Sequence, residues 1–272
     1  MKFGVSTFVT DEGIEPAVLG PALEERGFAS LFLAEHTHIP VSRETPYPAG
    51  GDLPRHYYRT LDPFVALTAA GVVTERLELG TGIALVNQRD PIILAKEIAS
   101  LDLVSRGRAV LGVGAGWNRE EMRNHGTDPT TRMSRMREHV LAVREMWEND
   151  QAEFHGEFVD FAPIFSWPKP VRRPPVLIGG WGAKTLDRVL EYGDGWMPIA
   201  TDDRDGKLAK AIADLRARAG RHVPVSAYSA SPRPDVVEQL TMAGVDEILF
   251  YLRTEPAGPT LERLDDLARL IT

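Results

Sequence analysis

The chain has 272 residues, of which 43% are hydrophobic and 26% charged, and its formal net charge is −8. This composition is typical of a globular protein that is large enough to bury its core without disulfides or metals. An acidic chain without a long basic run is a poor match for a nucleic-acid-binding protein. No apolar stretch approaches the roughly 20 residues of a membrane-spanning helix, so we expect no membrane partner.

The sequence contains no cysteine. Disulfides, thiolate catalysis, iron–sulfur clusters and cysteine-bound zinc are therefore excluded. The first ten residues lack the continuous apolar core of a signal peptide, and their pattern is that of a short strand. We therefore expect a cytoplasmic protein.

Segments with the patterns of strands and helices alternate along the chain. Short apolar runs typical of strands buried on both faces occur at residues 2–7, 31–34, 76–86, 109–113, 175–178, 196–199, 223–228 and 247–252. Helical periodicity or capping residues mark residues 16–26, 63–74, 91–104, 132–148, 183–192, 203–219, 234–243 and 259–271. Eight such units predict an α/β protein with a single (β/α)8 TIM-barrel domain over residues 1–272.

Two long insertions, at residues 37–61 and about 117–131, follow the second and fourth predicted strands. The loops that follow the strands of such a barrel form its catalytic face, so we expect both insertions beside the active site. An open doubly wound sheet is the main alternative. Its dinucleotide fingerprint would follow the first strand, where Ser6-Thr7-Phe8 does not match it.

The second predicted strand ends in a carboxylate and two histidines, Glu35, His36 and His38, before Pro40 stops it. Histidine can act as an acid, a base or a hydrogen-bond donor near neutral pH. We therefore take His36 and Glu35 as candidate catalytic residues. The alternative is that a histidine packs in the core and that Glu35 forms an ion pair.

A metal centre is a competing explanation for this histidine pair. It would require further ligands at the ends of other strands. Three of these ends supply no histidine or carboxylate: Gly179-Gly180-Trp181, Met197-Pro198 and Arg253-Thr254. We therefore predict no metal ligands.

Glycines gather at the ends of the third and fourth predicted strands. Gly80 and Gly82 indicate either a bend or the close approach of a ligand to the backbone. The run Gly112-Val113-Gly114-Ala115-Gly116 offers a wall without large side chains, against which a flat ring could lie. Trp117 follows this run and either lines a pocket or packs in the core.

A third glycine-rich segment, Gly179-Gly180-Trp181-Gly182-Ala183-Lys184, leads from the fifth predicted strand directly into a helix. Free backbone N–H groups at the start of a helix suit a phosphate group, and Lys184 adds positive charge. An ordinary tight turn is the alternative. Barrels usually hold phosphate after their seventh and eighth strands, so a site after the fifth departs from that rule.

Together, these segments resemble the bacterial luciferase-like superfamily of flavin and deazaflavin oxidoreductases. The matching pieces occur in family order and cover nearly the whole chain: Ala34-Glu35-His36-Thr37-His38, Leu79-Gly80-Thr81-Gly82-Ile83, Gly107-Arg108, Leu111-Gly112-Val113-Gly114-Ala115-Gly116-Trp117, Gly179-Gly180 and Gly193-Asp194-Gly195-Trp196. The Glu-His-Thr-His-Ile-Pro run and the insertion rich in Tyr and Pro are most similar to the branch that uses coenzyme F-420, an 8-hydroxy-5-deazaflavin.

The resemblance implies a homodimeric barrel that holds a flavin or deazaflavin ring at its carboxyl rim. It also implies a non-proline cis peptide between Gly82 and Ile83 that backs the ring. With the motifs above, it predicts the cofactor-binding residues Gly82, Ile83, Gly114, Gly116, Trp117, Gly179, Gly180, Trp181, Gly182 and Lys184. Four arginines could either bind an anionic cofactor tail or belong to a solvated loop surface: Arg43, Arg55, Arg59 and Arg89.

One departure concerns the proton donor. Trp117 occupies the position at which some deazaflavin dehydrogenases of the family carry a proton-donating acid, which puts a sugar-phosphate dehydrogenase reaction in doubt. Glu35 or His36, or Glu120 or Glu121 in the following loop, could fill that role.

The leading hypothesis is an oxidoreductase that transfers a hydride between coenzyme F-420 and a small organic substrate, with the hard chemistry carried by the cofactor. One alternative is an FMN-dependent monooxygenase that uses O2 and reduced flavin from a separate reductase. A barrel that binds flavin without catalysing a reaction is the other.

Overall fold

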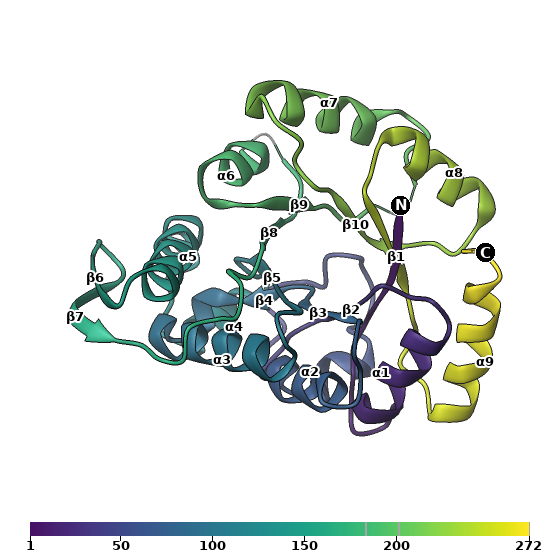
Figure 1. Cartoon of the computed structure of the whole chain (residues 1–272), viewed down its shortest axis with the longest axis horizontal. Coiled ribbons are helices and arrows are strands. Elements are labelled where there is room, and N and C mark those ends of the chain that lie inside the picture. The colour runs from purple at the N-terminus through teal and green to yellow at the C-terminus, as the bar shows by residue number, and fades with distance from the viewer. Residues whose placement is uncertain (183, 201, 272) are drawn as a thin grey trace.

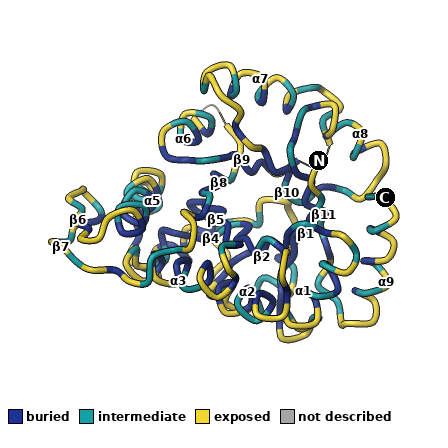
Figure 2. The backbone as a smooth tube through the Cα atoms, viewed as in Figure 1, coloured by how far each residue is buried: buried dark blue, intermediate teal, exposed yellow. Residues whose placement is uncertain are grey.

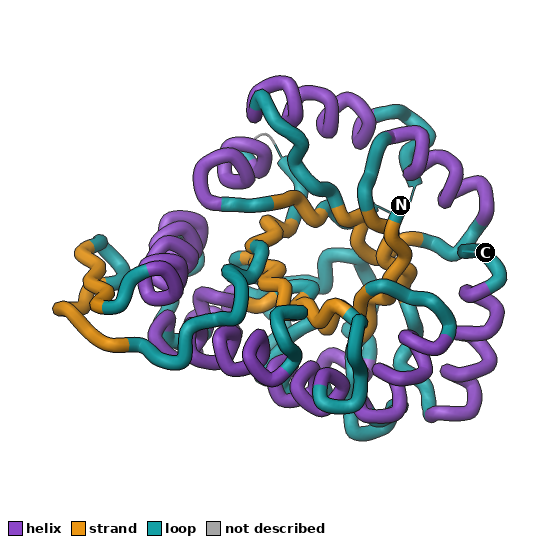
Figure 3. The backbone as a smooth tube through the Cα atoms, viewed as in Figure 1, coloured by secondary structure: helices purple, strands orange, loops and turns teal. Residues whose placement is uncertain are grey.

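A computed structural model describes the chain except for residues 183, 201 and 272. Its described part confirms the predicted TIM barrel: eight parallel strands form a ring, and helices surround it (Figures 1 and 3). The strand order is β10-β11-β1-β2-β3-β5-β8-β9. Parallel bridges between Trp196 and Val225 and between Ile199 and Tyr228 join β9 to β10 and close the ring.

The barrel strands are β1 (Lys2–Thr7), β2 (Ser30–Leu33), β3 (Glu78–Thr81), β5 (Ala109–Gly114), β8 (Val176–Gly179), β9 (Gly195–Met197), β10 (Ser226–Ala230) and β11 (Glu247–Tyr251). The helices are α1 (Pro16–Glu25), α2 (Pro63–Gly71), α3 (Pro91–Val104), α4 (Arg119–Asn124), α5 (Arg132–Glu148), α6 (Thr185–Tyr192), α7 (Lys207–Ala219), α8 (Pro234–Ala243) and α9 (Ala257–Ala268). Short 3₁₀ helices occur at η1 (Arg55–Tyr58) and η2 (Val86–Gln88).

The strands are buried on both faces, as their continuous apolar runs predict, and the outer faces of the helices are exposed (Figure 2). Capping side chains and prolines explain where α2 and α3 begin. The carboxylates of Asp62 and Asp90 each accept two hydrogen bonds from backbone N–H groups in the first turns of α2 and α3. Pro63 and Pro91 occupy the first positions of the same helices, where proline has no hydrogen bond to lose.

The third predicted strand, residues 76–86, was too long. The chain leaves β3 after Thr81 and resumes as the short β4 (Ala84–Leu85), which pairs with β5. The insertion at about residues 117–131 is partly helical, because Asn118 caps α4 by accepting a hydrogen bond from the backbone of Glu121. In the described residues, no helix combines the length and the apolar character that crossing a membrane requires.

We did not predict the antiparallel hairpin β6 (Gln151–His155) and β7 (Asp160–Phe165), which lies at the periphery beside α5 (Figure 1). A side chain of another element, α5, stabilises its turn. The Glu138 carboxylate on α5 accepts hydrogen bonds from the backbone N–H groups of Glu157, Phe158 and Val159. Local sequence signals could not reveal a turn whose stabilising partner lies on another element.

Candidate functional site

His36 leaves the carboxyl end of β2 and meets Glu121 of α4. Its Nδ1 lies 3.0 Å from both carboxylate oxygens of Glu121, and the two residues are only 7% and 1% exposed. A carboxylate can only accept hydrogen bonds, so Nδ1 carries a proton. Nε2 has no hydrogen-bond partner among the described residues and is available to a ligand. Glu121 was one of four alternatives for the proton donor, and the structure places it against His36.

Aromatic side chains from both insertions surround His36. The His36 ring centroid lies 5.0 Å from that of Tyr57 and 5.9 Å from that of Trp117. Tyr47 contacts both of these rings. Burial raises the pKa of Tyr57 well above its ordinary value, and the hydrogen bond with Tyr47 adds to the effect, so Tyr57 is a neutral phenol. These tyrosines were not among the predicted site residues, although the Tyr-rich composition of the insertion was a signal.

The peptide bond between Gly82 and Ile83 is cis, which confirms this prediction. Ile83 lies where the carboxyl ends of β5 and β8 meet. A Cβ atom added to Gly114 would lie 1.9 Å from Cδ1 of Ile83, and one added to Gly179 would lie 2.9 Å from Cγ2. A Cβ on Gly82 would lie 2.4 Å from the ring of Tyr228 on β10. These glycines therefore let Ile83 and Tyr228 occupy the barrel mouth.

Glu35 belongs to a different network. Its carboxylate is 3% exposed, accepts a 2.7 Å hydrogen bond from the backbone N–H of Leu85 and pairs with Arg89 at 2.6 Å. Arg89 also pairs with Asp62 and Glu97. Burial opposes the charge of Arg89, but these carboxylates outweigh it and raise the pKa of Arg89. The structure thus brings His36 together with Glu121 and places Glu35 in an ion-pair network.

The other arginines proposed for an anionic tail differ in their surroundings. Arg55 pairs with Glu12, and Arg59 pairs with Asp11. Arg43 lies over the ring of Trp117, with its guanidinium carbon 6.0 Å from the ring centroid. Of these three residues, Arg43 is therefore the one without a carboxylate partner among the described residues.

One further acid, Glu120, and two further histidines, His38 and His125, lie on or beside α4. The Glu120 carboxylate accepts hydrogen bonds from the backbone and hydroxyl of Thr45, which ties the insertion at residues 37–61 to α4. Burial would raise the pKa of Glu120, but these hydrogen bonds outweigh it and lower the pKa, so Glu120 is ionised at neutral pH and has no proton to donate. His38 contacts Asn124, and its ring lies 5.2 Å from that of His125.

The glycine-rich turn after β8, the fifth strand of the barrel, leads to α6. Gly180 has φ +104° and Gly182 has φ +126°, a region that favours glycine. Trp196 holds the turn by donating a 2.9 Å hydrogen bond to the Gly180 carbonyl. Trp181 and Lys184 are exposed beside it, whereas the predicted Ala183 lies outside the described residues. Within the described part of the chain, the backbone N–H groups of Trp181 and Gly182 have no acceptor.

Gly116, the last of the predicted cofactor-binding glycines, has φ +80° and lies against Met122 of α4. Over the described ranges, residues 1–182, 184–200 and 202–271, no three His, Asp or Glu side chains gather closely enough to hold a metal ion.

Comparison with known proteins places this site in a family. The model of the luciferase-like monooxygenase family matches residues 16–244. The protein Rv0953c of Mycobacterium tuberculosis is 40% identical, over 98% of each chain. The "F420-dependent hydroxymycolic acid dehydrogenase" of the same organism is 28% identical, over 74% of this chain and 53% of its own length.

Two solved structures share the fold. An "F420-dependent secondary alcohol dehydrogenase in complex with an F420-acetone adduct" has a TM-score of 0.77 at 17% identity, over the full length of both chains. The monooxygenase RslO1 from Streptomyces bottropensis has a TM-score of 0.76 at 20% identity, over 100% of this chain and 97% of its own. With the family model covering most of the barrel, and with the cis peptide and the strand-end histidine in place, the chain belongs to the luciferase-like monooxygenase family.

Proposed function

We propose that the protein is a coenzyme F-420-dependent oxidoreductase that transfers a hydride between the deazaflavin and a small organic substrate. The observation that carries this proposal is the buried His36–Glu121 pair after β2, which lies among the aromatic rings of Tyr57 and Trp117. Similar proteins named as F420-dependent dehydrogenases support the choice of cofactor. When bound, the deazaflavin supplies or accepts the hydride.

The residues present fit a planar ring with a phosphate-bearing tail. Gly114 and Gly179 leave space that Ile83 fills, so a ring entering the mouth would lie on Ile83 and not on the bare glycine backbone. The backbone N–H groups of Trp181 and Gly182, which have no acceptor among the described residues, and the Lys184 side chain lie ahead of α6 and suit phosphate. Arg43, at the rim over Trp117, can add a second cation.

His36 would hold and move the proton that balances hydride transfer. Oxidation of an alcohol to a carbonyl releases a hydroxyl proton, and reduction in the other direction requires one. Nε2 of His36 takes or returns this proton at the substrate oxygen. Glu121 acts as a positioning residue, because it fixes the Nδ1–H tautomer and stabilises the imidazolium while the proton is held.

Titration of the purified protein with F-420 and with FMN, followed by fluorescence, tests this proposal. We expect F-420 to bind about tenfold or more tightly than FMN, a difference of about 1.4 kcal/mol. FMN binding that is tenfold tighter would contradict the cofactor assignment. It would favour the second candidate function, an FMN-dependent monooxygenase, which the structural match to RslO1 supports; oxygen consumption with reduced FMN would then be the decisive measurement.

The Gly114→Ala variant tests the role of Ile83. The new methyl group would lie 1.9 Å from Cδ1 of Ile83 and would force that side chain toward the mouth. We expect the Kd for F-420 to rise about tenfold or more and stability to fall by about 1–3 kcal/mol. Fluorescence titration and urea unfolding measure the two effects. Gly258→Ala is the matched control, because a Cβ there meets no atom within 4 Å; equal Kd values in the two variants would contradict this role.

We also propose that the protein is a homodimer joined through the exposed apolar face of α2 and α3. This α2–α3 face consists of Val65, Val72, Ile93, Leu103 and Val104. Large apolar side chains that stay exposed on neighbouring helices are typical of an interaction site. Because a twofold interface is formed by the same patch on both copies, each substitution acts twice.

We expect the double variant Val72→Glu/Ile93→Glu to be monomeric by light scattering at concentrations at which the wild type is a dimer. Val72 and Ile93 are 62% and 58% exposed in the single chain, so glutamate there leaves the protomer's fold intact. Met242→Glu, at an 80% exposed position on α8, is the control and should remain dimeric. A monomeric wild type, or a dimer that survives the double substitution, would exclude this interface.

A further inference from the structure

Tyr228 of β10 extends its ring into the barrel mouth. Together with Ile83, the ring packs on the apolar interior of the barrel, which is formed by Phe32, Val110, Leu177, Met197 and Leu249. Gly82 leaves the space for this ring, since a Cβ atom there would lie 2.4 Å from its Cε2 atom. Tyr228 therefore lies directly beside the Gly82–Ile83 peptide, the surface on which a flat cofactor ring would rest.

The backbone around Tyr228 departs from regular strand geometry. Ala227 pairs with Ile248 and Ala230 pairs with Phe250, so three steps along β10 match two along β11, and one residue of β10 is extra. Ser229 has φ +61°, a left-handed conformation that residues other than glycine adopt rarely. Such bulges are over-represented beside active sites, where they re-aim a side chain. A costly local conformation thus accompanies the inward placement of Tyr228.

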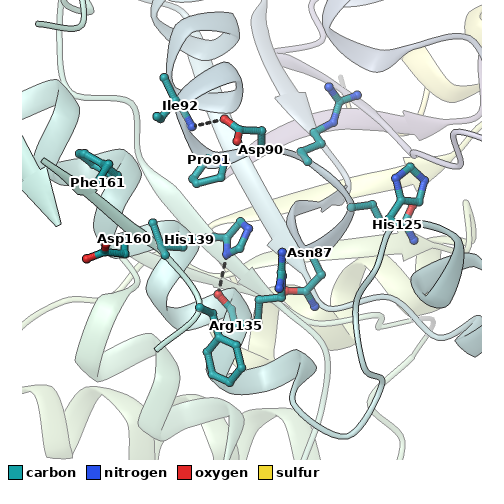
Figure 4. Close-up of a pocket in the computed structure, with 13 residues that line it drawn as sticks. Asn87, Asp90, Pro91, Ile92, His125, Arg135, His139, Asp160 and Phe161 are labelled. Atoms are coloured by element: carbon teal, nitrogen blue, oxygen red, sulfur yellow. Dashed lines mark hydrogen bonds between the residues drawn. The ribbon is translucent and has the colours of Figure 1, made fainter. Parts of the chain in front are cut away.

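The Tyr228 hydroxyl is open to a molecule in the mouth. It has no hydrogen-bond partner among the described residues, yet it is not one of the unpartnered side-chain atoms that the fold seals from solvent. The pocket between η2, α5 and the β6–β7 hairpin offers a contrast (Figure 4). Asn87, His125 and His139 line that pocket and each has a polar atom without a partner among the described residues, but these atoms are sealed and no ligand reaches them.

Tyr228 keeps its proton and shares a neighbour, Tyr57, with His36. Burial raises the pKa of the Tyr228 phenol well above its ordinary value, and Tyr251 adds to the effect, so the hydroxyl is a hydrogen-bond donor at neutral pH. Tyr228 in turn contributes to the raised pKa of Tyr57, whose ring centroid lies 5.0 Å from that of His36. The Tyr57 hydroxyl donates to that of Tyr47 at 3.4 Å. Of Tyr57 and Tyr228, the latter therefore has a proton to donate to a ligand.

We propose that Tyr228 is a catalytic residue that donates a hydrogen bond to the oxygen of a neutral alcohol or carbonyl substrate. This role rests on the proposed function, which brings a substrate oxygen to His36. An alcohol hydroxyl donates to Nε2 of His36 and still has lone pairs for the Tyr228 hydroxyl. An ammonium group has no lone pair with which to accept from Tyr228, so the two residues together select alcohols over amines.

The hydrogen bond from Tyr228 strengthens as the reaction proceeds. The hydride leaves the carbinol carbon for the deazaflavin, and the hydroxyl proton passes to Nε2 of His36. Negative charge therefore builds up on the substrate oxygen before the C–O double bond is complete, and the Tyr228 hydroxyl stabilises this charge while keeping its own proton. Removal of one such donor from a preorganised site lowers kcat about 10²- to 10³-fold.

Tyr228→Phe removes the hydroxyl and retains the ring that packs against Gly82. We expect kcat to fall about 10²- to 10³-fold, measured by the loss of F-420 fluorescence with 2-propanol, cyclohexanol and benzyl alcohol. The Kd for F-420 should change little, because the aromatic surface beside Ile83 remains. Tyr58→Phe, at a 52% exposed position of η1, is the matched control and should turn over as the wild type does.

Binding of the alcohol supplies a readout that needs no turnover. An alcohol cannot pass its hydride to a cofactor that is already reduced, so saturation-transfer NMR on the protein loaded with reduced F-420 measures the Kd of the alcohol alone. We expect Tyr228→Phe to raise this Kd about threefold or more, which corresponds to the loss of one hydrogen bond. Tyr58→Phe should leave the Kd of the alcohol unchanged.

The outcomes separate this role from the proposed function. A normal kcat or an unchanged Kd for the alcohol in a Tyr228→Phe variant that binds F-420 would overturn the role of Tyr228. A loss of turnover in Tyr251→Phe but not in Tyr228→Phe would do the same, as would a wild type that binds F-420 and oxidises none of the three alcohols. Failure of the wild type to bind F-420 would instead overturn the proposed function.

Discussion

Glu121→Gln is expected to lower kcat about 10²- to 10⁴-fold, the range spanned by loss of general acid–base catalysis and of a carboxylate that orients a histidine. Glutamine is similar in size but cannot stabilise the imidazolium, and its amide can donate to Nδ1 and favour the wrong tautomer of His36. The rate is measured by the loss of F-420 fluorescence with the first alcohol that the wild type oxidises in a panel. The Kd for F-420 should change little, because Glu121 is only 1% exposed and its carboxylate contacts His36.

Glu120→Gln is the matched control for this prediction. Glu120 is the adjacent residue of α4 and is also buried, but its carboxylate binds Thr45. We expect only a small change in kcat, whereas Glu121→Asp should recover part of the lost rate. Equal losses in the Glu120→Gln and Glu121→Gln variants would show that α4, and not the carboxylate–histidine pair, is responsible. Normal turnover by His36→Ala would exclude His36 as the proton carrier.

Arg89→Met is expected to lower the free energy of unfolding by about 3–5 kcal/mol, the cost of removing one partner from a buried ion pair. The Glu35 carboxylate is 3% exposed and would lose its cation, while Asp62 and Glu97 would lose theirs at the edge of the network. Methionine retains apolar contact with the Phe64 ring, over which the Arg89 guanidinium lies at 4.6 Å. Urea unfolding followed by circular dichroism measures the change.

Two companion variants separate charge pairing from general damage to the fold. Arg55→Met removes an arginine from a solvent-exposed pair with Glu12 and should leave the urea midpoint nearly unchanged. Adding Glu35→Gln to Arg89→Met should restore part of the stability, because the buried charge is removed while an oxygen remains for the backbone N–H of Leu85. If the double variant is less stable than Arg89→Met alone, an uncompensated Glu35 is not the cause.

Features that depend on local pattern were predictable. Continuous apolar runs bounded by glycine, proline and capping residues predicted the barrel strands, since burial on both faces of a parallel sheet requires such runs. The ordered motifs predicted the family and the cis bond between Gly82 and Ile83, both of which are confirmed. The histidine at the end of β2 was predictable because strand ends of a barrel converge on its catalytic face.

Features that join distant segments were not predictable. Glu35 and His36 are neighbours in the chain, yet one pairs with Arg89 and the other with Glu121, because successive residues leave a strand in opposite directions. Gly114 was predicted to be part of a bare wall and Gly179 part of a phosphate-binding turn, but each makes room for Ile83. The hairpin turn depends on Glu138 of α5, which lies 19 to 21 residues away in the sequence.

The sequence by itself therefore determined the barrel, the family and the place of the histidine, because these follow from the local order of apolar, capping and glycine residues. Only the tertiary structure decided which carboxylate faces His36 and which side chain fills the mouth. Those choices depend on α4 folding back over β2 and on Ile83 entering the space between β5 and β8, and no local pattern encodes such contacts.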